Sequence, residues 1–492
     1  MNGTKTLNRE QLLAARHKDG PMMVLAGPGS GKTTVLCTRV LYLTKTCKVP
    51  PEQLLVITFT RAAAAEMEKR CMEQSAECFR SHKPEFGTFH SAFFQILRET
   101  EHYTPQDIIG AAECQKLLWE IAKEEVPSYG GISTDFASLL LGELSKQKNE
   151  GKLLSAVGNA IKLPEILCTP ERKKELWHIL MRYQAELARR HLLDFDDMLL
   201  LCLEKLKKDR NLLFKLRKRW QYLMIDEFQD INRVQYEIVR LLAWPRNNLF
   251  IVGDDDQGIY GFRGARPELM LRFPHEYPDA KRILLRKNYR SSAEVVEASL
   301  RLIRTNKQRF EKDLIAQNRG GTKPEVCGYA SAKAEAEAII AKLKKRLAAG
   351  LLLSDAAILY RSRRAAITMR QCLQEAGLWD SKRQQNGESQ DMPCCMTFHA
   401  SKGLEFDEVF LIGANEGITP AKEAVSSAEQ LEEERRMFYV AMTRAKRLLH
   451  ISFTNGSYNK EKWIASRFIE ECIPTEHPGM DEGKCQMKEQ ET

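Results

Sequence analysis

Short apolar runs recur in both halves of the chain, and stretches with the spacing of amphipathic helices lie between them. This alternation is typical of α/β folds with parallel sheets, so we predict two α/β units. The strands expected in the first unit are residues 22–26, 54–58, 222–225 and 249–252. Those expected in the second are residues 282–285, 356–360, 394–398, 409–412 and 448–453, and the clearest helices are 61–71, 330–349 and 430–442.

Residues 93–194 interrupt the alternation, because they carry helical patterns and no strand pattern. The clearest helix is expected at 171–191, where the apolar side chains recur on one face: Leu176, Ile179, Leu180, Tyr183 and Leu187. We therefore predict an all-helical insertion within the first unit.

Two further stretches are polar. Residues 379–393 are nearly all polar and are expected to form a loop, with 381–392 exposed. The chain from 473 to 492 contains few large apolar residues and is expected to be a disordered tail.

Length and charge are consistent with a soluble protein of several domains. The chain has 492 residues, too many for one core, with 43% hydrophobic and 29% charged residues. Lys and Arg exceed Asp and Glu by 75 to 66, which gives a net charge of +9 and a mild preference for a polyanionic partner.

The cysteines and the N-terminus argue against a metal-cluster protein, a secreted protein and a membrane protein. None of the 13 cysteines forms a Cys-x-x-Cys pair, so neither a zinc nor an iron–sulfur framework is indicated. The N-terminus lacks the apolar core of a signal peptide, and no run approaches the roughly 20 apolar residues of a membrane span. We expect a cytoplasmic protein with reduced thiols and no membrane partner.

The first chemical motif follows the apolar run at 22–26 and reads Ala26-Gly27-Pro28-Gly29-Ser30-Gly31-Lys32-Thr33. A strand, a glycine-rich turn and a helix in this order form a phosphate-binding loop, in which Lys32 reaches the β/γ oxygens and the Thr33 hydroxyl can hold Mg²⁺. The alternative is a glycine-rich turn that binds nothing.

A second motif, Asp226-Glu227, ends the apolar run at 222–225. An acidic pair at this position is usually a solvated strand end. With a phosphate loop in the same chain, Asp226 is expected to hold Mg²⁺ and Glu227 to orient the attacking water. Together the two motifs describe a nucleoside triphosphatase.

The two motifs belong to a longer ordered series that runs from residue 7 to residue 446. Its other members are Leu7-Asn8-Arg9-Glu10-Gln11, Thr58-Phe59-Thr60-Arg61, Gly87-Thr88-Phe89-His90, Gly253-Asp254-Asp255-Asp256-Gln257-Gly258-Ile259-Tyr260-Gly261-Phe262-Arg263, Asn288-Tyr289-Arg290-Ser291, Thr397-Phe398-His399 through Glu405-Phe406, and Glu432 through Thr443-Arg444-Ala445. The whole series resembles the superfamily 1 DNA helicases of the UvrD/Rep/PcrA type.

The resemblance implies an α/β fold of two RecA-like P-loop NTPase domains with parallel sheets and an all-helical insertion, called 1B, in the first. On this basis we expect residues 1–92 and 195–278 to form the first motor domain (1A), 93–194 to form 1B, and 279–472 to form the second motor domain (2A). Family members usually insert another helical subdomain, 2B, where this chain has only residues 379–393. We therefore expect 2B to be absent.

The resemblance also implies the residues that handle ATP and Mg²⁺. Gln257 would sense the γ-phosphate, and Arg290 and Arg444, carried by the second domain, would act as arginine fingers beside the catalytic residues Lys32, Asp226 and Glu227. Gln11 would recognise adenine, Tyr289 would stack on it, and Glu405 would bind the ribose. The remaining contacts would come from the phosphate loop with Thr34, which stands where several relatives have an arginine over the adenine.

A single DNA strand would cross the top of the two domains. The positions that match the family's DNA channel are Phe59, Thr60, Thr88, His90, Tyr260, Phe262, Arg263 and His399. Aromatic side chains suit such a channel because every base has a face on which a ring can stack. Position 262 is commonly Trp in the family, so Phe262 offers a smaller face.

The resemblance favours an ATP-dependent 3′→5′ single-stranded DNA translocase and helicase in DNA repair or replication, acting on single strands or on duplexes with a 3′ tail. One alternative is a translocase that strips proteins from DNA and unwinds weakly because 2B is absent. Another is a non-motor nucleic-acid-binding or regulatory module with a degenerate ATP site, although such a module would not need the intact catalytic set. Stacking and phosphate contacts leave RNA open as a track.

Overall fold

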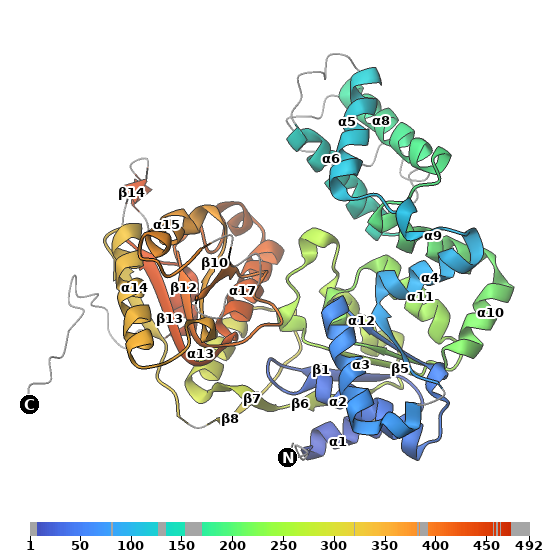
Figure 1. The fold of residues 1–492 in the computed structure, drawn as a ribbon, viewed down its shortest axis with the longest axis horizontal. Coiled ribbons are helices and arrows are strands. Elements are labelled where there is room, and N and C mark those ends of the chain that lie inside the picture. Colours follow the sequence, from blue (N-terminus) through green and yellow to red (C-terminus); the bar gives the residue numbers. More distant parts are fainter. Residues whose placement is uncertain are drawn as a thin grey trace, which may run out of the picture. The chain divides into compact units, whose positions relative to one another are not determined.

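The computed structural model describes residues 7–79, 82–125, 134–152, 170–318, 320–380, 383, 392–455, 457–458, 461–462 and 464–473 (Figure 1). They form two compact units. The first comprises the chain up to Arg290 together with Gln308–Gln317, and the second comprises Ser291–Lys307 and the chain from Asn318 onward. This division falls further along the chain than the boundary expected at 278.

The first unit is built on a six-stranded sheet in the order β3-β2-β4-β5-β1-β6, in which every pairing is parallel. Its strands are β1 (Met22–Ala26), β2 (Leu54–Thr58), β3 (Glu85–Thr88), β4 (Tyr222–Ile225), β5 (Leu249–Gly253) and β6 (Lys281–Leu285). All residues of β1, β2, β4 and β5 are buried, which explains why these strands appear in the sequence as continuous apolar runs.

Helices cover both faces of this sheet, and successive strand residues enter two different cores. Met22 and Val24 pack in one core with α1 (Arg9–Ala15), α2 (Lys32–Leu41) and α3 (Arg61–Ser75). Met23 and Leu25 pack in the other core. The helices of that second core are α4 (Phe89–Glu101), α9 (Phe195–Lys208), α10 (Arg210–Arg219), α11 (Arg233–Ala243) and α12 (Pro267–Glu276).

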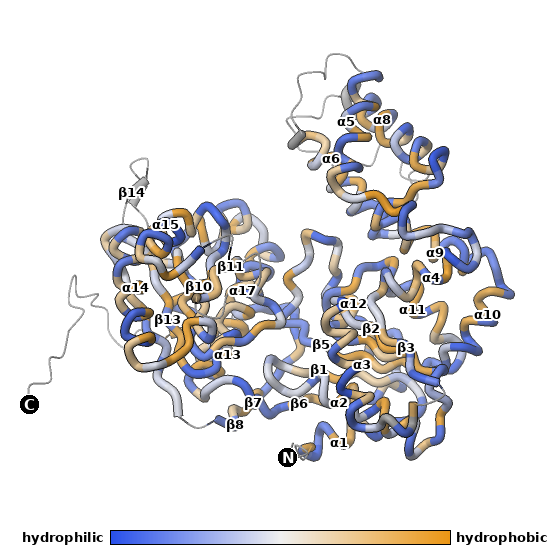
Figure 2. The backbone as a smooth tube through the Cα atoms, in the orientation of Figure 1, coloured by the Kyte–Doolittle hydropathy of each residue, from blue (hydrophilic) through white to orange (hydrophobic). Residues whose placement is uncertain are grey.

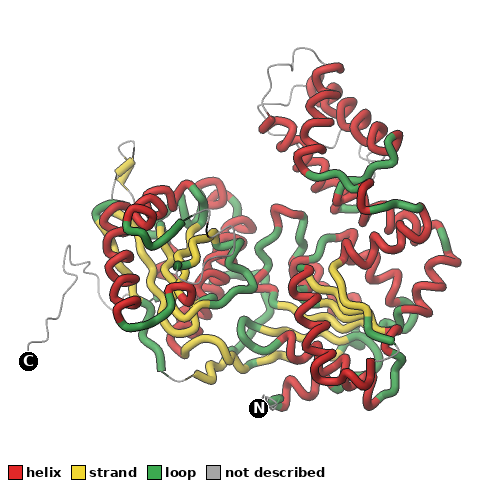
Figure 3. Tube along the Cα trace, viewed as in Figure 1, coloured by secondary structure: helices red, strands yellow, loops and turns green. Residues whose placement is uncertain are grey.

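The region expected as a helical insertion contains α5 (Ala111–Glu125), α6 (Thr134–Asn149) and α8 (Pro170–Arg189). In the part that the structure describes it is built from helices and loops (Figure 3). Its core includes every residue of the face predicted for 171–191, namely Leu176, Ile179, Leu180, Tyr183 and Leu187, and that prediction is confirmed.

The second unit contains a five-stranded parallel sheet in the order β11-β10-β12-β13-β9. The strands are β9 (Glu325–Tyr329), β10 (Ala356–Tyr360), β11 (Cys394–Thr397), β12 (Phe406–Ile412) and β13 (Ala445–Thr454). The helices packed with them are α13 (Ala293–Ile303), α14 (Ala332–Ala348), α15 (Ile367–Glu375), α17 (Ala428–Met442) and α18 (Arg467–Cys472). Figure 2 shows the apolar strands of each sheet enclosed by more polar helices.

Two strands connect the units. β7 (Lys287–Ser292) leads from the first unit into α13, and β8 (Ile315–Asn318), paired with β7, leads from residues 308–317 into the rest of the second unit. The chain therefore passes between the units three times, since it leaves after Arg290, returns at Gln308 and leaves again after Gln317.

The assignment of one strand was wrong. Residues 282–285 were expected in the second unit, but β6 pairs in parallel with β1 in the first sheet, with Ile283 beside Val24. An apolar run shows that a strand exists and carries no information about which sheet receives it. The strands β3 and β9 were not predicted, because each is only partly buried and contains a glycine.

The loop expected at 379–393 lies mostly outside the described residues, as do residues 474–492 of the expected tail. The ends of that loop differ from the expectation: Trp379 and Met392 are buried, at 6% and 4% exposed. Trp379 packs in the core of the second unit, and the Arg370 guanidinium lies 4.7 Å from its ring centroid. None of the helices in the described part of the chain combines the length and apolar character needed to cross a membrane.

Candidate nucleotide site and nucleic-acid interface

The glycine-rich loop runs from Ala26 at the end of β1 to Lys32 at the start of α2. Gly29 and Gly31 have φ angles of +65° and +86°, which residues with a side chain rarely adopt. A Cβ at Gly29 would stand 2.4 Å from the Arg290 Cβ, and one at Gly31 would stand 2.7 Å from the Gln11 Nε2. Both positions therefore require glycine, and the loop ends at a helix N-terminus suited to phosphate.

Lys32 and Glu227 face each other across this loop. The Lys32 Nζ donates to the Glu227 Oε2 at 3.1 Å, and both side chains are largely buried. Burial by itself would lower the pKa of Lys32, but the nearby carboxylates of Glu227, Asp226 and Asp254 raise it. The lysine is therefore a fixed cation, as a phosphate ligand must be.

Asp226 follows the last residue of β4 and is buried. Burial, and then the charge of Glu227, raise the pKa of Asp226 to about 7. A carboxylate that is disfavoured in this way gains from a divalent cation, and the carboxylate of Asp226 and the hydroxyl of Thr33 in the first turn of α2 are oxygen ligands of the kind that Mg²⁺ prefers. The residues present therefore fit the expected metal.

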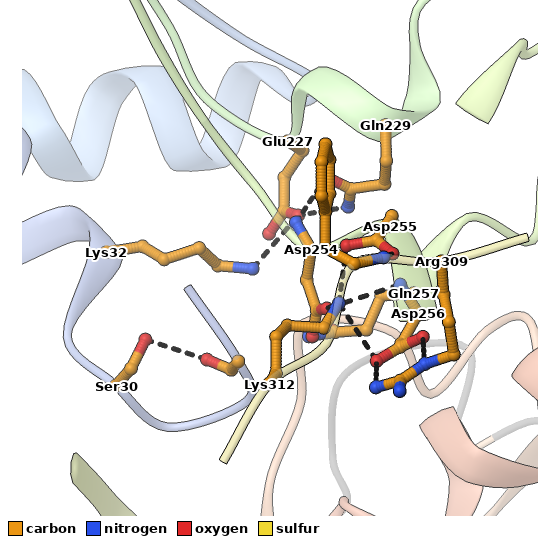
Figure 4. Close-up of polar contacts among 12 residues, drawn as sticks. Ser30, Lys32, Glu227, Gln229, Asp254, Asp255, Asp256, Gln257, Arg309 and Lys312 are labelled. Carbon is orange, nitrogen blue, oxygen red and sulfur yellow. Dashed lines mark hydrogen bonds and ion pairs between the residues drawn. The ribbon is translucent and has the colours of Figure 1, made fainter. Parts of the chain in front are cut away.

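Gln229 links the acidic pair to the next motif (Figure 4). Its Nε2 donates to the Glu227 Oε2 at 2.6 Å, and its Oε1 accepts from the backbone N–H of Asp254 at 2.9 Å. The Gln257 Nε2 in turn donates to the Asp254 Oδ2 at 2.6 Å. A continuous chain of hydrogen bonds thus runs from Lys32 to Gln257. Gln229 was not predicted, although it stands two residues after Glu227 in the motif.

Two cations beside this network were also not predicted. The Lys312 Nζ lies 2.6 Å from the Asp254 Oδ1, and Arg309 binds both carboxylate oxygens of Asp256, at 2.8 and 2.7 Å. Both residues lie on the segment that returns to the first unit. Their sequence neighbourhood is polar and carries no recognisable signal.

Gln11, Tyr289 and Arg290 lie against the phosphate loop within the first unit. The Gln11 Nε2 donates to the Ser30 carbonyl at 2.9 Å, and the backbone N–H of Tyr289 donates to the Gly29 carbonyl at 2.9 Å. The Asn8 Nδ2 donates to the Tyr289 hydroxyl at 2.9 Å and so fixes its ring. Arg290 was expected on the second domain, but the structure groups it with the first unit because β7 begins beside the loop.

His399, Glu405 and Arg444 lie in the second unit. Arg444 is buried, and its guanidinium donates to the carbonyls of Val440 and Leu404 at 2.9 and 3.1 Å. Glu405 is half exposed and lies 3.5 Å from the Lys446 Nζ. These three residues therefore belong to a different unit from the phosphate loop.

Aromatic side chains cluster at one place in the first unit. The rings of Phe59 and Tyr260 stack with centroids 5.0 Å apart and planes 9° apart, and Phe262 meets Tyr260 edge-on at 6.1 Å. The Arg263 guanidinium lies within 5.6 Å of the ring centroids of Tyr260 and Phe262. Phe262 is 56% exposed, so a large apolar face meets solvent beside a cation. This combination suits a stacked, negatively charged strand.

His90 lies at the start of α4, where the Thr88 hydroxyl caps the helix by accepting from the Ser91 N–H. Burial lowers the pKa of His90 to about 4, opposed by a hydrogen bond with the backbone of Phe195 and assisted by Arg61. The ring is therefore neutral at pH 7 and offers a face rather than a charge. Phe195, 54% exposed and edge-on to His90 at 5.5 Å, extends this surface and was not predicted.

A phosphate loop that faces an acidic strand end in a parallel sheet, followed by a second sheet of the same kind, defines the class of P-loop proteins with two RecA-like units. Comparison with known families then identifies this chain as a member of the UvrD/Rep helicase family. The family model of the UvrD/REP helicase N-terminal domain matches residues 7–278, and that of the UvrD-like helicase C-terminal domain matches residues 283–386 and 378–456.

Individual relatives agree with this assignment. The chain is 35% identical to YjcD of Bacillus subtilis over 364 residues, which are 72% of this chain and 46% of that protein. It is 33% identical to the ATP-dependent DNA helicase PcrA of Staphylococcus epidermidis over 371 residues, covering 73% of this chain and 48% of that protein. The chain thus spans about half the length of the curated relatives it matches.

Proposed function

We propose that this protein is an ATP-dependent 3′→5′ single-stranded DNA translocase and helicase that acts in DNA repair or replication. One observation carries the proposal: the hydrogen-bond chain that joins Lys32 to Gln257 through Glu227, Gln229 and Asp254. A phosphate loop linked in this way to a sensing amide can couple the presence of a γ-phosphate to a change elsewhere in the protein.

For hydrolysis, the Lys32 ammonium binds β/γ oxygens and the Glu227 carboxylate orients the attacking water. Thr33 and Asp226 would hold Mg²⁺, which when bound neutralises charge on the phosphates. Arg290 and Arg444 would stabilise the charge that develops on the transferred phosphoryl group. Gln11, Tyr289 and Glu405 would hold the nucleoside, with Thr34 beside the loop.

The track is proposed to be a single DNA strand, and two features support it. The cluster of Phe59, Tyr260, Phe262 and Arg263 can stack bases without reading their sequence. A PcrA relative is named as an ATP-dependent DNA helicase. Thr60, Thr88, His90 and, in the second unit, His399 are proposed to line the same track.

A second candidate is a translocase that displaces proteins and separates strands weakly. It is favoured by the shortness of the 379–393 stretch, which leaves no room for a further domain between β10 and β11.

One set of measurements tests both candidates. ATP turnover should rise with single-stranded DNA and rise less with duplex DNA or RNA, and 3′-tailed duplexes should be unwound while 5′-tailed ones are not. Displacement of a protein bound to a 3′-tailed strand without unwinding would favour the second candidate. A lack of DNA-stimulated ATP turnover would refute both.

A further inference from the structure

Three consecutive aspartates share a buried cluster with two cations (Figure 4). The side chains of Asp254, Asp255, Asp256, Lys312 and Arg309 are each at most 8% exposed. Water therefore cannot replace the contacts within this cluster, and each charge depends on its partners.

Lys312 contacts all three carboxylates. Its Nζ lies 2.6 Å from the Asp254 Oδ1, 2.5 Å from the Asp255 Oδ1 and 2.9 Å from the Asp256 Oδ2. The backbone N–H of Phe310 adds a bond to the Asp255 Oδ2 at 2.8 Å. The turn from Asp254 to Gln257 is therefore held by the segment 308–317, which is far from it in the sequence.

The electrostatics explain why a cation is needed. Burial, opposed by Lys312 and assisted by the other two aspartates, raises the pKa of Asp255 to about 6. Burial alone would also raise the pKa of Asp256. Lys312 and Arg309 outweigh this effect, so the pKa of that carboxyl is lowered. Removal of one partner from such a cluster would leave an uncompensated buried charge.

Asp254 connects the cluster to the proposed chemistry. Lys312 binds its Oδ1, while the Gln257 Nε2 binds its Oδ2. The backbone N–H of Asp256 also donates to the Oδ1, at 3.2 Å. The two oxygens of one carboxylate are thus held by different partners, and a carboxylate can only accept. The Gln257 amino group is consequently held by Asp254, and Lys312 helps to fix the orientation of Asp254 together with the Asp256 N–H.

We propose that Lys312 is a positioning residue for ATP hydrolysis, acting through Asp254 to orient the γ-phosphate-sensing amide of Gln257. The inference rests on the proposed function, since it assigns a role within that reaction. The Lys312 ammonium contacts the three aspartates. We therefore expect it to affect turnover indirectly, through Asp254 and Gln257.

The test uses a variant that keeps the charge balance of the cluster. Lys312→Met with Asp255→Asn removes one cation and one anion, leaving Arg309 paired with Asp256 and Asp254 without its lysine. The amide oxygen introduced at position 255 can still accept from the Phe310 N–H. Lys281→Met, on exposed β6 surface, is the matched lysine control.

In the full chain with single-stranded DNA, we expect the paired variant to lower kcat for ATP about ten- to hundredfold, the range for loss of a hydrogen bond to a charged group. The KM should change less than about threefold, because the phosphate loop is intact. Lys281→Met should match the parent.

A double-mutant cycle with Gln257→Ala separates positioning from general damage. If Lys312 acts through Gln257, adding the paired substitutions to Gln257→Ala should cause less than about a twofold further loss. Equal losses in both backgrounds, or an unchanged kcat in the paired variant, would overturn the inference while leaving the proposed function standing. An inactive parent would instead refute the proposed function, and the inference with it.

Asp254→Asn provides the same cycle if the paired variant does not fold, as judged by its circular dichroism. This substitution keeps the size of the side chain and removes the negative charge of the carboxylate that both Lys312 and Gln257 contact. Non-additivity with Gln257→Ala supports the positioning role, and additivity overturns it.

Discussion

At the scale of single residues, Glu227 is the carboxylate on which the proposed chemistry depends most directly. Its Oε2 accepts from both Lys32 and Gln229, so its position is fixed before substrate arrives. Its backbone has φ +50°, a left-handed conformation that is uncommon for residues other than glycine. Such a residue is held by its surroundings, which is expected where geometry serves catalysis.

We predict that Glu227→Gln keeps ATP bound and lowers turnover by about a hundredfold or more, because the amide retains the size of the side chain and loses the basic oxygen. Lys32→Ala should weaken both ATP binding and turnover, since it removes the phosphate-binding cation. Both variants should still bind single-stranded DNA. Equilibrium binding of a fluorescent ATP analogue and steady-state ATPase assays measure the difference.

Glu52→Gln, at an exposed position of the same unit, is the control and should behave as the parent does. A Glu227→Gln protein that hydrolyses ATP at the parental rate would remove this carboxylate from the mechanism.

The lowered pKa of His90 predicts that the free energy of unfolding depends on pH. Burial depresses its pKa to about 4 in the folded protein, against about 6.5 in an unfolded chain, so the unfolded state binds more protons between these values. The contribution of neutral His90 is therefore complete above about pH 6.5 and is lost as the pH falls toward 4.

Thermal unfolding of the parent and of His90→Phe, measured from pH 8 to pH 4, tests this. The melting temperature of the parent should fall relative to that of the variant within that window. If the melting temperatures of the two proteins changed in parallel with pH, folding would not lower the pKa of His90.

At the scale of elements, the turn from Tyr260 to Arg263 should behave as a stacking platform. Phe262 is more than half exposed and lies beside Tyr260 and Arg263, so its removal takes away a surface that the core does not need. We predict that Phe262→Ala costs about 1–3 kcal/mol in single-strand affinity with little dependence on base sequence. Affinity should also weaken steeply with salt, because phosphate contacts release counterions.

Phe214→Ala is the matched control, since Phe214 is 59% exposed on α10 of the same unit and lies beside Lys218. Fluorescence anisotropy with labelled oligonucleotides of different sequence measures both variants. Equal effects of the two substitutions would mean that the loss is not specific to the platform.

Local patterns predicted best the strands that are buried on both faces. β1, β2, β4 and β10 occupy the predicted residues. The same patterns could not assign β6, because its position beside β1 is decided by tertiary packing. At the site, Lys32 and Glu227 were predicted because each lies in a recognisable sequence motif. Lys312 could not be predicted, because the three carboxylates that it contacts lie more than 50 residues away in the sequence.

The stretch between β10 and β11 gives a further prediction at this scale. Trp379 and Met392 are buried, so the test keeps both and replaces residues 382–390 by a short glycine linker. DNA-stimulated ATPase should change by less than about twofold, since the phosphate loop and the Phe262 platform lie in the other unit. A large loss in that assay would mean that this stretch itself contacts DNA or another part of the chain.

At the scale of the whole molecule, the two units share one chain that crosses between them more than once. Residues 281–290 and 308–317 belong to the first unit although they lie beyond the N-terminal family match at 278. They supply β6 at the edge of the first sheet and the cations of the buried aspartate cluster.

A fragment cut at residue 278 should therefore express poorly. Without β6 the backbone of β1 becomes an open sheet edge, which pairs readily with other chains, and without Lys312 the three buried aspartates repel one another. A fragment of residues 1–290 joined by a Gly/Ser linker to residues 308–317 should instead be monomeric. Size-exclusion chromatography of the two would distinguish them, and a monodisperse 1–278 fragment would contradict this expectation. The natural segment for expression, crystallisation or fusion of the first unit is thus discontinuous in sequence.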